Sequence, residues 1–542
     1  MSELTDRLVV PGSGLAGLKS FWRQDLTAGF LVFLVALPLC LGVAVASGFP
    51  PMAGILTAIV GGLLVSRISG SHVTINGPAA GLIVVVLSSV QSLGEGDAVA
   101  GYRYTLAAIV VSGLLQCAMG RFKFGRMAAF FPSSVVHGML AAIGIIIMAR
   151  QIPVMVGVNV SGTSMFAVIR QLPQALAFYV PTVALVAVVA IAILAAWPSV
   201  RNSVLGRIPA PMVVIVTGVL LGQILGLGHL NPELGYETPK GLLVGPSFLV
   251  SIPDSLGASI VYPDFSKLGT VTFWGNVVAI TLVGSLETLL SAAAVDKLDP
   301  AKRYSDLNRD LLAIGLGNAL VGMIGGLPMI AEIVRSSANI DAGARTGWAN
   351  FFHGAFLLIF VIALPHVIDL IPLASLAALL VYTGFRLASP EAFARTLDLG
   401  REQLGIFVIT VVAVLATNLL AGVLIGVASK LLLHLWRGVA LANLLRISYS
   451  VEHSAGSACV IRVRGSAIFS NVVALKSELA GFPNGKSVTF DLSDVYLIDH
   501  TVMEFIDQFC NDYRASGGRC EIHGLASHEA FAPHELAARI RK

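Results

Sequence analysis

Long apolar stretches separated by short polar loops recur from Leu26 to about Ala440. A helix of about 20 apolar residues crosses a bilayer, and a shorter one crosses part of it. The pattern predicts full spans near 26–46, 52–68, 101–119, 133–149, 178–197, 209–228, 273–294, 309–324, 348–364, 370–388, 404–420 and 421–440. Two further stretches, near 73–92 and 327–340, are interrupted. We therefore expect an α-helical polytopic membrane protein of about fourteen segments.

The two interrupted stretches are the most informative part of the pattern. The first contains Asn76-Gly77-Pro78, and the second contains Gly325-Gly326-Leu327-Pro328, each followed by the start of a helix. A helix that begins inside a bilayer leaves its first N–H groups without partners and presents a partial positive charge. Such breaks persist only where they line a cavity in the protein. The sequence therefore predicts a transporter with an anion site near the midplane.

The order of the segments predicts an inverted repeat. The interrupted stretches are the third and the tenth segments, so each is third in its own half of seven. Because seven is odd, the second half enters the membrane from the opposite side to the first. The two half-helices should then meet, N-terminus to N-terminus, near the middle.

Charge gives the sidedness of the membrane part. The chain is 56% hydrophobic and 12% charged, against roughly 25% charged in soluble domains, which fits a membrane protein. With the N-terminus inside, most loop Lys and Arg residues are cytoplasmic, and the outer loops hold only Arg103, Arg150, Arg170, Lys240 and Lys267. This asymmetry places both termini in the cytoplasm. Residues 1–24 lack the features of a signal peptide, so the first apolar run is expected to be a retained span. No basic stripe with interleaved aromatic residues indicates nucleic acid.

The chain changes character after the last predicted span, which divides it into domains 1–25, 26–440 and 441–542. Residues 459–464, 487–493 and 520–523 have the patterns of strands, and 502–509 has that of a helix. This alternation predicts a small cytoplasmic α/β domain. The five cysteines include no close pair, so neither a disulfide framework nor a zinc site is expected: Cys40, Cys117, Cys459, Cys510 and Cys520.

The motifs, in their order, resemble those of the SulP family of anion transporters with a C-terminal STAS domain. The resemblance is carried by the run from Arg23 to Gly29, Ala36-Leu37-Pro38, Asn76-Gly77-Pro78, the stretch from Asn308 to Asn318, Arg335-Ser336, and, in the tail, Gly465 to Asn471 and Asp491 to Thr501. It implies the seven-plus-seven fold that nucleobase carriers share. It also implies a homodimer in which a core domain carries the substrate past a gate domain in an elevator-like motion.

Glu287 is the leading candidate for ion coupling. It lies deep in the span near 273–294, and Ser291 follows one helical turn later on the same face. An ionisable group at that depth is costly unless it is paired, protonated or facing water. It could carry a proton or, together with Ser291, bind a sodium ion. In the similar cyanobacterial bicarbonate carriers an Asp stands here and helps to bind sodium. A packing carboxyl is the alternative.

Glu332 and Arg335 lie beside the second break. Glu332 could cap its half-helix and partly take the place of the anion, or it could titrate and admit the anion only when protonated. We expect a structural or tuning role for it rather than direct coupling. Arg335 could pair with a neighbouring carboxylate or bind the substrate.

The anion itself should be bound by the backbone at the two breaks. The expected positions are Asn76, Gly77, Pro78, Ala79, Ala80, Met329, Ile330 and Ala331. Pro38 could bend the first span toward them, or it could be a mere irregularity of that helix. In the tail, Thr501 could be phosphorylated, although a helix N-cap is the simpler interpretation.

These features predict secondary active transport of a small inorganic anion in a bacterial inner membrane, with bicarbonate first and sulfate second. Coupling to sodium or to protons stays open, and no cofactor is expected beyond a sodium ion. Alternatives are a dicarboxylate or nucleobase permease, an anion-sensing membrane regulator, or a channel. No nucleotide-binding loop or catalytic triad indicates an enzyme.

Overall fold

The computed structural model describes residues 14–125, 131–160, 165–200, 208–228, 236–237, 243–244, 247–253, 255–453, 458–479, 487–515 and 517–542. By packing, the chain divides into two compact units. The first consists of residues 1–125 and 143–386, and the second of residues 126–142 and 387–542. Packing thus groups the last helices with the C-terminal domain. The division at residue 440, between membrane and aqueous parts, stays a prediction.

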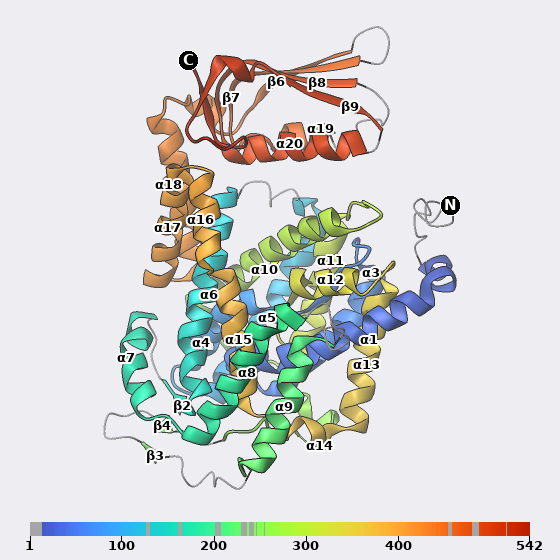
Figure 1. The fold of residues 1–542 in the computed structure, drawn as a ribbon, viewed down its shortest axis with the longest axis vertical. Coiled ribbons are helices and arrows are strands. Elements are labelled where there is room, and N and C mark those ends of the chain that lie inside the picture. The colour runs from blue at the N-terminus through green and yellow to red at the C-terminus, as the bar shows by residue number, and fades with distance from the viewer. Residues whose placement is uncertain are drawn as a thin grey trace. The chain divides into compact units, whose positions relative to one another are not determined.

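Helices make up most of the first unit (Figure 1). In chain order they are α1 (Gly14–Ala46), α2 (Pro51–Val60), a π-helical turn (Gly61–Val65), α3 (Ser66–Ile68), α4 (Ile83–Gly94), α5 (Ala98–Arg121), α6 (Ser133–Met155, of which the first residues belong to the second unit), α7 (Met165–Ala177), α8 (Pro181–Val200), α9 (Ala210–Ile224), α10 (Val271–Leu298), α11 (Leu307–Ile324), α12 (Ile333–Asp341), α13 (Trp348–Ala363), α14 (Pro365–Ile368) and α15 (Leu373–Leu387). Three short strands form a small sheet of order β2-β4-β3: β2 (Val158–Asn159), β3 (Tyr236–Glu237) and β4 (Leu243–Val244).

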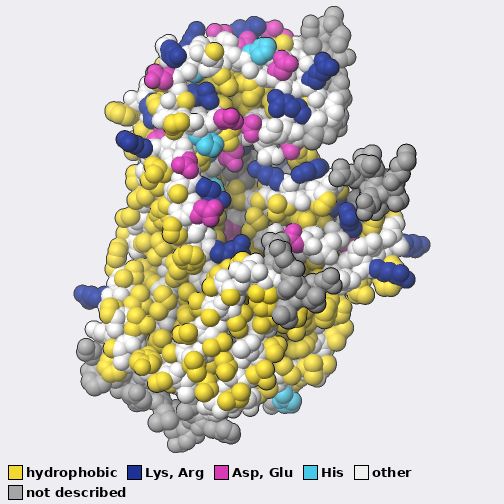
Figure 2. Space-filling model, in the orientation of Figure 1, with side chains coloured by type: hydrophobic (Ala, Val, Ile, Leu, Met, Phe, Trp, Pro, Cys, Tyr) yellow, Lys and Arg dark blue, Asp and Glu magenta, His cyan; other side chains and the backbone are white. Residues whose placement is uncertain are grey.

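Eight helical stretches of the described residues are long and apolar enough to cross a membrane. Large apolar side chains such as Val188, Leu220 and Ile362 are more than half exposed on the helices, and Figure 2 shows hydrophobic side chains over much of the visible helical surface. In water these surfaces would be unfavourable, whereas lipid accepts them. The prediction of a multi-pass helical membrane protein is confirmed. The count of fourteen crossings and the inverted repeat remain predictions.

Both interrupted stretches contain a short strand in place of helix. Strand β1 (Ile75–Pro78) pairs antiparallel with β5 (Met329–Glu332), with Asn76 opposite Ala331. Pro78 cannot donate a backbone hydrogen bond and so cannot continue a helical ladder. A turn of 3-10 helix, Ala80–Leu82, leads from β1 into α4, while α12 starts directly after β5. The two breaks therefore meet, as the order of the segments predicted.

Small residues allow the helices around the breaks to pack closely. Helix α1 packs against α12 and β1, α10 against β5 and α12, and α5 against α11. A Cβ atom at Gly315 of α11 would lie 2.6 Å from the carbonyl oxygen of Gly113 of α5. Only glycine permits this approach of two backbones, which is a common packing mode within membranes.

The second unit combines helices with an α/β domain. Its elements are α16 (Pro390–Asp398), α17 (Arg401–Ala416), α18 (Leu419–Trp436), β6 (Ser448–His453), β7 (Ala458–Ala467), α19 (Val473–Leu479), β8 (Ser487–Ile498), α20 (His500–Ala515), β9 (Arg519–His523), β10 (His528–Ala530) and β11 (Arg539–Arg541). The sheet has the order β10-β11-β8-β7-β6, and β9 pairs with β8. Figure 1 shows α19 and α20 on one face of it. Ile461, Phe490 and Ile506 lie in their shared core. The predicted α/β domain is confirmed.

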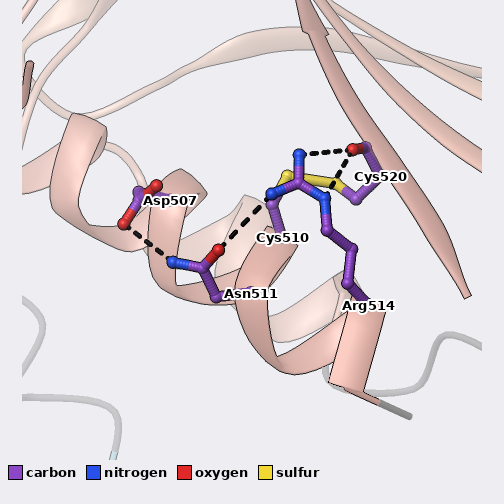
Figure 3. Close-up of a disulfide and its surroundings, with 5 residues drawn as sticks. All are labelled: Asp507, Cys510, Asn511, Arg514 and Cys520. Carbon is purple, nitrogen blue, oxygen red and sulfur yellow. Dashed lines mark hydrogen bonds between the residues drawn. A yellow bond between two sulfur atoms is a disulfide. The ribbon is translucent and has the colours of Figure 1, made fainter. Parts of the chain in front are cut away.

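The expectation that the cysteines form no disulfide is wrong for one pair. Cys510 of α20 and Cys520 of β9 are bonded, with their Cα atoms 5.1 Å apart (Figure 3). A turn containing Gly517, whose φ is +88°, reverses the chain between helix and strand. This reversal brings together two cysteines that are ten positions apart in the sequence. The prediction considered only cysteines close together in the sequence and therefore missed this pair. Arg514 supports the same place by donating from Nε and Nη2 to the carbonyl oxygen of Cys520, at 3.0 and 2.6 Å.

Candidate functional site

The pairing of β1 with β5 brings the two predicted backbone sites together. Gly77 lies opposite Ile330, and Pro78 lies opposite Met329. The remaining predicted positions, Asn76, Ala79, Ala80 and Ala331, belong to the same segments, and of the whole set only Ala80 is partly exposed. Two helix N-termini, those of α4 and α12, therefore begin from one small paired sheet. Their partial positive charges favour an anion between them.

Asn318 of α11 fixes the position of β5. Its Nδ2 donates to the carbonyl oxygen of Met329 at 3.2 Å, and the backbone N–H of Met329 donates back to Oδ1 at 2.7 Å. The same Nδ2 also donates to Oε1 of Gln116 at 2.8 Å. The Met329 N–H, which the sequence analysis expected to bind the anion, thus already has an acceptor in this structure. The sequence contained a signal for Asn318, since a buried amide within an apolar span requires partners.

Arg335 places a buried positive charge beside the paired strands. Its side chain is 1% exposed, and Nη2 donates to the carbonyl oxygen of Pro78 at 3.0 Å. Nε and Nη1 have no hydrogen-bond partner among the residues that the structure describes. A Cβ atom at Gly77 would lie 2.6 Å from Nη1, so glycine is needed for the guanidinium to approach. Arg335 therefore keeps two donors for a further acceptor.

Pro38 lies in α1, the helix that also bears Cys40. It is buried within α1, which runs through it as a helix, and the irregular backbone of α1 lies at Phe21 instead. Cys40, two residues further along, lies beside the guanidinium of Arg335. α1 thus borders the site, while the predicted bend at Pro38 stays a prediction.

Glu287 of α10 reaches the start of the first half-helix. The carboxylate is 5% exposed, and a Cβ atom at Gly81 would overlap it. Its Oε1 has no hydrogen-bond partner within the described part of the chain. Ser291 is half-buried one turn away, in the same helix. Glu287 therefore contacts the segment that was predicted to bind the anion, and its pairing with Ser291 around sodium stays a prediction.

Glu332 stands at the N-cap position of α12, with φ −100° and ψ 113°. Among the described residues its side chain makes no capping hydrogen bond to that helix, so the expectation that it caps its own half-helix is wrong. The carboxylate instead lies near the Ala80 N–H, at the start of the other half-helix. It is also close enough to Arg335 and Glu287 to interact with their charges. Two carboxylates and one guanidinium thus surround the two breaks.

Thr501, the predicted regulatory residue, is half-buried in the first turn of α20. The capping role belongs to Asp499, whose Oδ1 accepts from the Val502 N–H at 2.9 Å. The prediction that Thr501 is the N-cap of this helix is therefore wrong. Its phosphorylation stays a prediction.

A buried charge cluster on α17 and α18 was not predicted. Lys430 lies 3.3 Å from Oε1 of Gln403 and 3.6 Å from Oε1 of Glu402. Glu402 also pairs with Arg437, and His434 pairs with Asp499. The spacing of Lys430, His434 and Arg437 places them on one face of α18, which was the available signal.

Comparisons with known proteins address the whole chain. The family model described as "Sulfate permease family" matches residues 22–412, and the model of the STAS domain matches residues 449–528. YvdB of Bacillus subtilis (strain 168), a sulfate transporter by provisional name, is 25% identical over 524 residues, covering 93% of this chain and 92% of its own. The "Bicarbonate transporter BicA" of Synechocystis is 24% identical over 490 residues, covering 87% and 83%.

Solved structures share the fold. The transmembrane domain of the cyanobacterial bicarbonate transporter BicA aligns with a TM-score of 0.64 at 22% identity, covering 74% of this chain and 97% of that one. The structure of SLC26A9 aligns with a TM-score of 0.67 at 15% identity, covering 93% and 84%. At these identities the likeness establishes the fold alone. The family resemblance drawn from the motifs is confirmed by the family match.

Proposed function

This chain belongs to the sulfate permease family, and we propose that it is a secondary active transporter of a small inorganic anion, with bicarbonate first and sulfate second. The family consists of transporters rather than enzymes, and anion transport is common to the relatives named above. The observation that carries the proposal is the pairing of β1 with β5. This pairing brings together, at one buried place, two helix N-termini and the two Arg335 nitrogen donors, Nε and Nη1, that have no hydrogen-bond partner among the described residues.

A small anion suits this place better than a larger metabolite. The side chains of Gly77, Ala79, Ala80 and Ala331 are small and apolar, so recognition falls to backbone N–H groups and to one guanidinium. Such donors recognise charge and size, with little means to distinguish functional groups on a larger molecule. Bicarbonate stands first because a single negative charge adds less repulsion beside Glu287 and Glu332 than the two charges of sulfate do.

Ion coupling belongs to the same proposal. Glu287, with Ser291 and Glu332, would bind a sodium ion or carry a proton together with the anion. The elevator-like motion of a core against a gate domain, the homodimer, the bacterial inner membrane and the cytoplasmic termini are likewise proposed, on the basis of family resemblance and of the charge asymmetry of the loops.

Uptake into proteoliposomes tests the proposal. The purified full chain is reconstituted, and labelled bicarbonate, sulfate and succinate are offered with sodium and proton gradients imposed separately. Uphill accumulation of bicarbonate or sulfate under one of the gradients is expected. Accumulation of succinate alone would instead favour a dicarboxylate permease. Flux that only dissipates anion gradients would indicate a channel, and no flux would favour a regulator.

A further inference from the structure

Glu332 occupies a position that its own helix does not explain. Its backbone is held in place, since Oγ of Ser336 donates to the Glu332 carbonyl oxygen at 2.5 Å and accepts from the Ile75 N–H at 2.9 Å. A side chain at this N-cap position could readily bond to α12. The backbone of Glu332 lies on β5, which pairs with β1, and its carboxylate lies near the Ala80 N–H at the start of the other half-helix, while among the described residues it makes no capping hydrogen bond to α12.

We propose that Glu332 is a tethered carboxylate that occupies the N-terminus of the first half-helix in place of the transported anion, and that it must take up a proton before the anion can bind. The inference rests on the proposed function and deepens it. Of the coupling roles proposed for the two carboxylates, it assigns Glu332 the uptake of the proton, where the sequence suggested a structural or tuning role.

The chemistry of the competition is simple. A carboxylate is a planar oxyanion of charge −1, as bicarbonate is. Both can accept hydrogen bonds from the Ala80 N–H and from the guanidinium of Arg335. Because Glu332 is attached to the chain, its effective concentration at this place is high, on the order of millimolar or above. Protonation forms an O–H bond on the carboxyl group and removes its charge. The Ala80 N–H and the charge of Arg335 are then available to the incoming anion.

The charges around the site favour the binding of an anion together with a proton on Glu332. The titratable and charged groups there are Cys40 on α1, Glu287 on α10, Arg335 on α12 and His353 on α13. With both glutamates ionised, the acidic groups already outnumber the single guanidinium. A further anion would add a second uncompensated charge in a region of low dielectric constant. One proton on Glu332 for each monovalent anion keeps the net charge of the site constant.

Buried polar groups without hydrogen-bond partners give a second line of support for a ligand site here. Arg335 is almost fully buried, and its Nε and Nη1 donate to no oxygen or nitrogen atom among the described residues. Glu287 is also buried, and its Oε1 has no hydrogen-bond partner among the same described residues. Buried donors and acceptors without partners are expected at a site where an anion and a proton bind and are released.

The test is anion exchange at equal pH on both sides of the vesicle membrane, without sodium, for the wild type and for Glu332→Gln. The probes are labelled sulfate and labelled nitrate, because neither changes charge between about pH 5.5 and 8.5, whereas bicarbonate does. If one proton must bind before the anion, wild-type apparent affinity falls about tenfold per pH unit on the alkaline side. Glu332→Gln should change less than about twofold over the same range, and it should lose accumulation driven by a proton gradient.

The controls separate the possible failures. Glu391→Gln makes the same change at an exposed position of α16 and should behave as the wild type. Glu332→Ala replaces the Gln variant should that variant not fold. If either Glu332 variant keeps the tenfold dependence, or if Glu287→Gln alone removes it, the inference is overturned. If the wild type exchanges none of labelled bicarbonate, sulfate and nitrate, the proposed function itself fails, a result that the Glu332 variants cannot produce.

Discussion

His434 Nε2 lies 3.5 Å from Oδ2 of Asp499, and both side chains are completely buried. Asp499 also accepts from the Phe469 N–H at 2.7 Å and from the Val502 N–H at 2.9 Å. One carboxylate therefore joins α18 to the segment after β7 and to the start of α20. Within the second unit, this contact ties the last long helix to the α/β domain.

Asp499→Ala should destabilise this unit strongly. The substitution removes the contact with His434 and leaves two buried backbone N–H groups without their acceptor, and each unpaired buried group costs about 1–3 kcal/mol. Thermal unfolding of the full chain in detergent measures the effect. Asp494→Ala is a matched control on β8, the strand that ends just before Asp499, because its ion pair with Arg541 is about half exposed and should be worth less than about 1 kcal/mol. Equal stability of both variants would mean that the buried pair contributes nothing.

The same carboxyl group predicts a dependence of stability on pH. Burial alone would raise the pKa of Asp499, but the hydrogen bond and charge of His434, the charge of Lys430 and the Val502 N–H together hold it below its ordinary value of 3.8. A lowered pKa in the folded state stabilises the fold fully above about pH 3.8, and this contribution is lost as the pH falls through the lower, folded value. Melting temperatures between about pH 5 and pH 3 should fall more steeply for the wild type than for Asp499→Asn. Parallel curves would contradict the assignment.

The long-range plan of the molecule was predictable because lipid permits few solutions. A backbone in a bilayer must form helices or a closed barrel unless it lines a cavity, so the long apolar stretches predicted a helical membrane part and Asn76-Gly77-Pro78 predicted the first break. The inward side chains of strands such as 487–493 gave the α/β domain in the same way. In both cases a strong local pattern was enough.

Long-range contacts were not predictable in this way. The disulfide depends on a reversal between α20 and β9, and the direction of the Glu332 side chain depends on the register of β1 with β5. α7 was missed because it is amphipathic and contains Pro173, so it lacks a continuous apolar run. Such features follow from tertiary packing, on which local sequence patterns give little information.

Asn318→Leu should lower transport more than it lowers expression. Leucine has a similar volume but cannot bond to either backbone group of Met329, and each unpaired buried group costs about 1–3 kcal/mol. β5 would then shift relative to β1, and the donors of the site would lose their alignment. Initial rates of anion uptake, normalised to protein in the membrane, should fall by at least about tenfold. Ser112→Ala, at a buried polar position of α5 that makes no hydrogen bond to Met329 in the described part of the chain, serves as the comparison and should retain most of the rate.

Gly81→Ala should uncouple or abolish transport by displacing one carboxylate. The added methyl group would overlap the carboxylate of Glu287, which has little room to retreat because it is almost fully enclosed. Anion uptake driven by an ion gradient should fall by at least about tenfold, since a small misplacement of a coupling group has effects of this size. Proteoliposome uptake under imposed proton and sodium gradients measures it.

Gly275→Ala supplies the control for this substitution. Gly275 lies on α10, the helix that bears Glu287, and a Cβ atom there would meet nothing within 4 Å. Alanine should therefore be tolerated and, because glycine is the poorer helix former, should stabilise α10 by about 0.5–1 kcal/mol. Wild-type uptake by Gly81→Ala would show that Glu287 can leave its contact with Gly81 without loss, and the carboxylate would then act elsewhere. Loss of uptake by Gly275→Ala as well would mean that α10 tolerates no substitution, and the effect at Gly81 could not be attributed to Glu287.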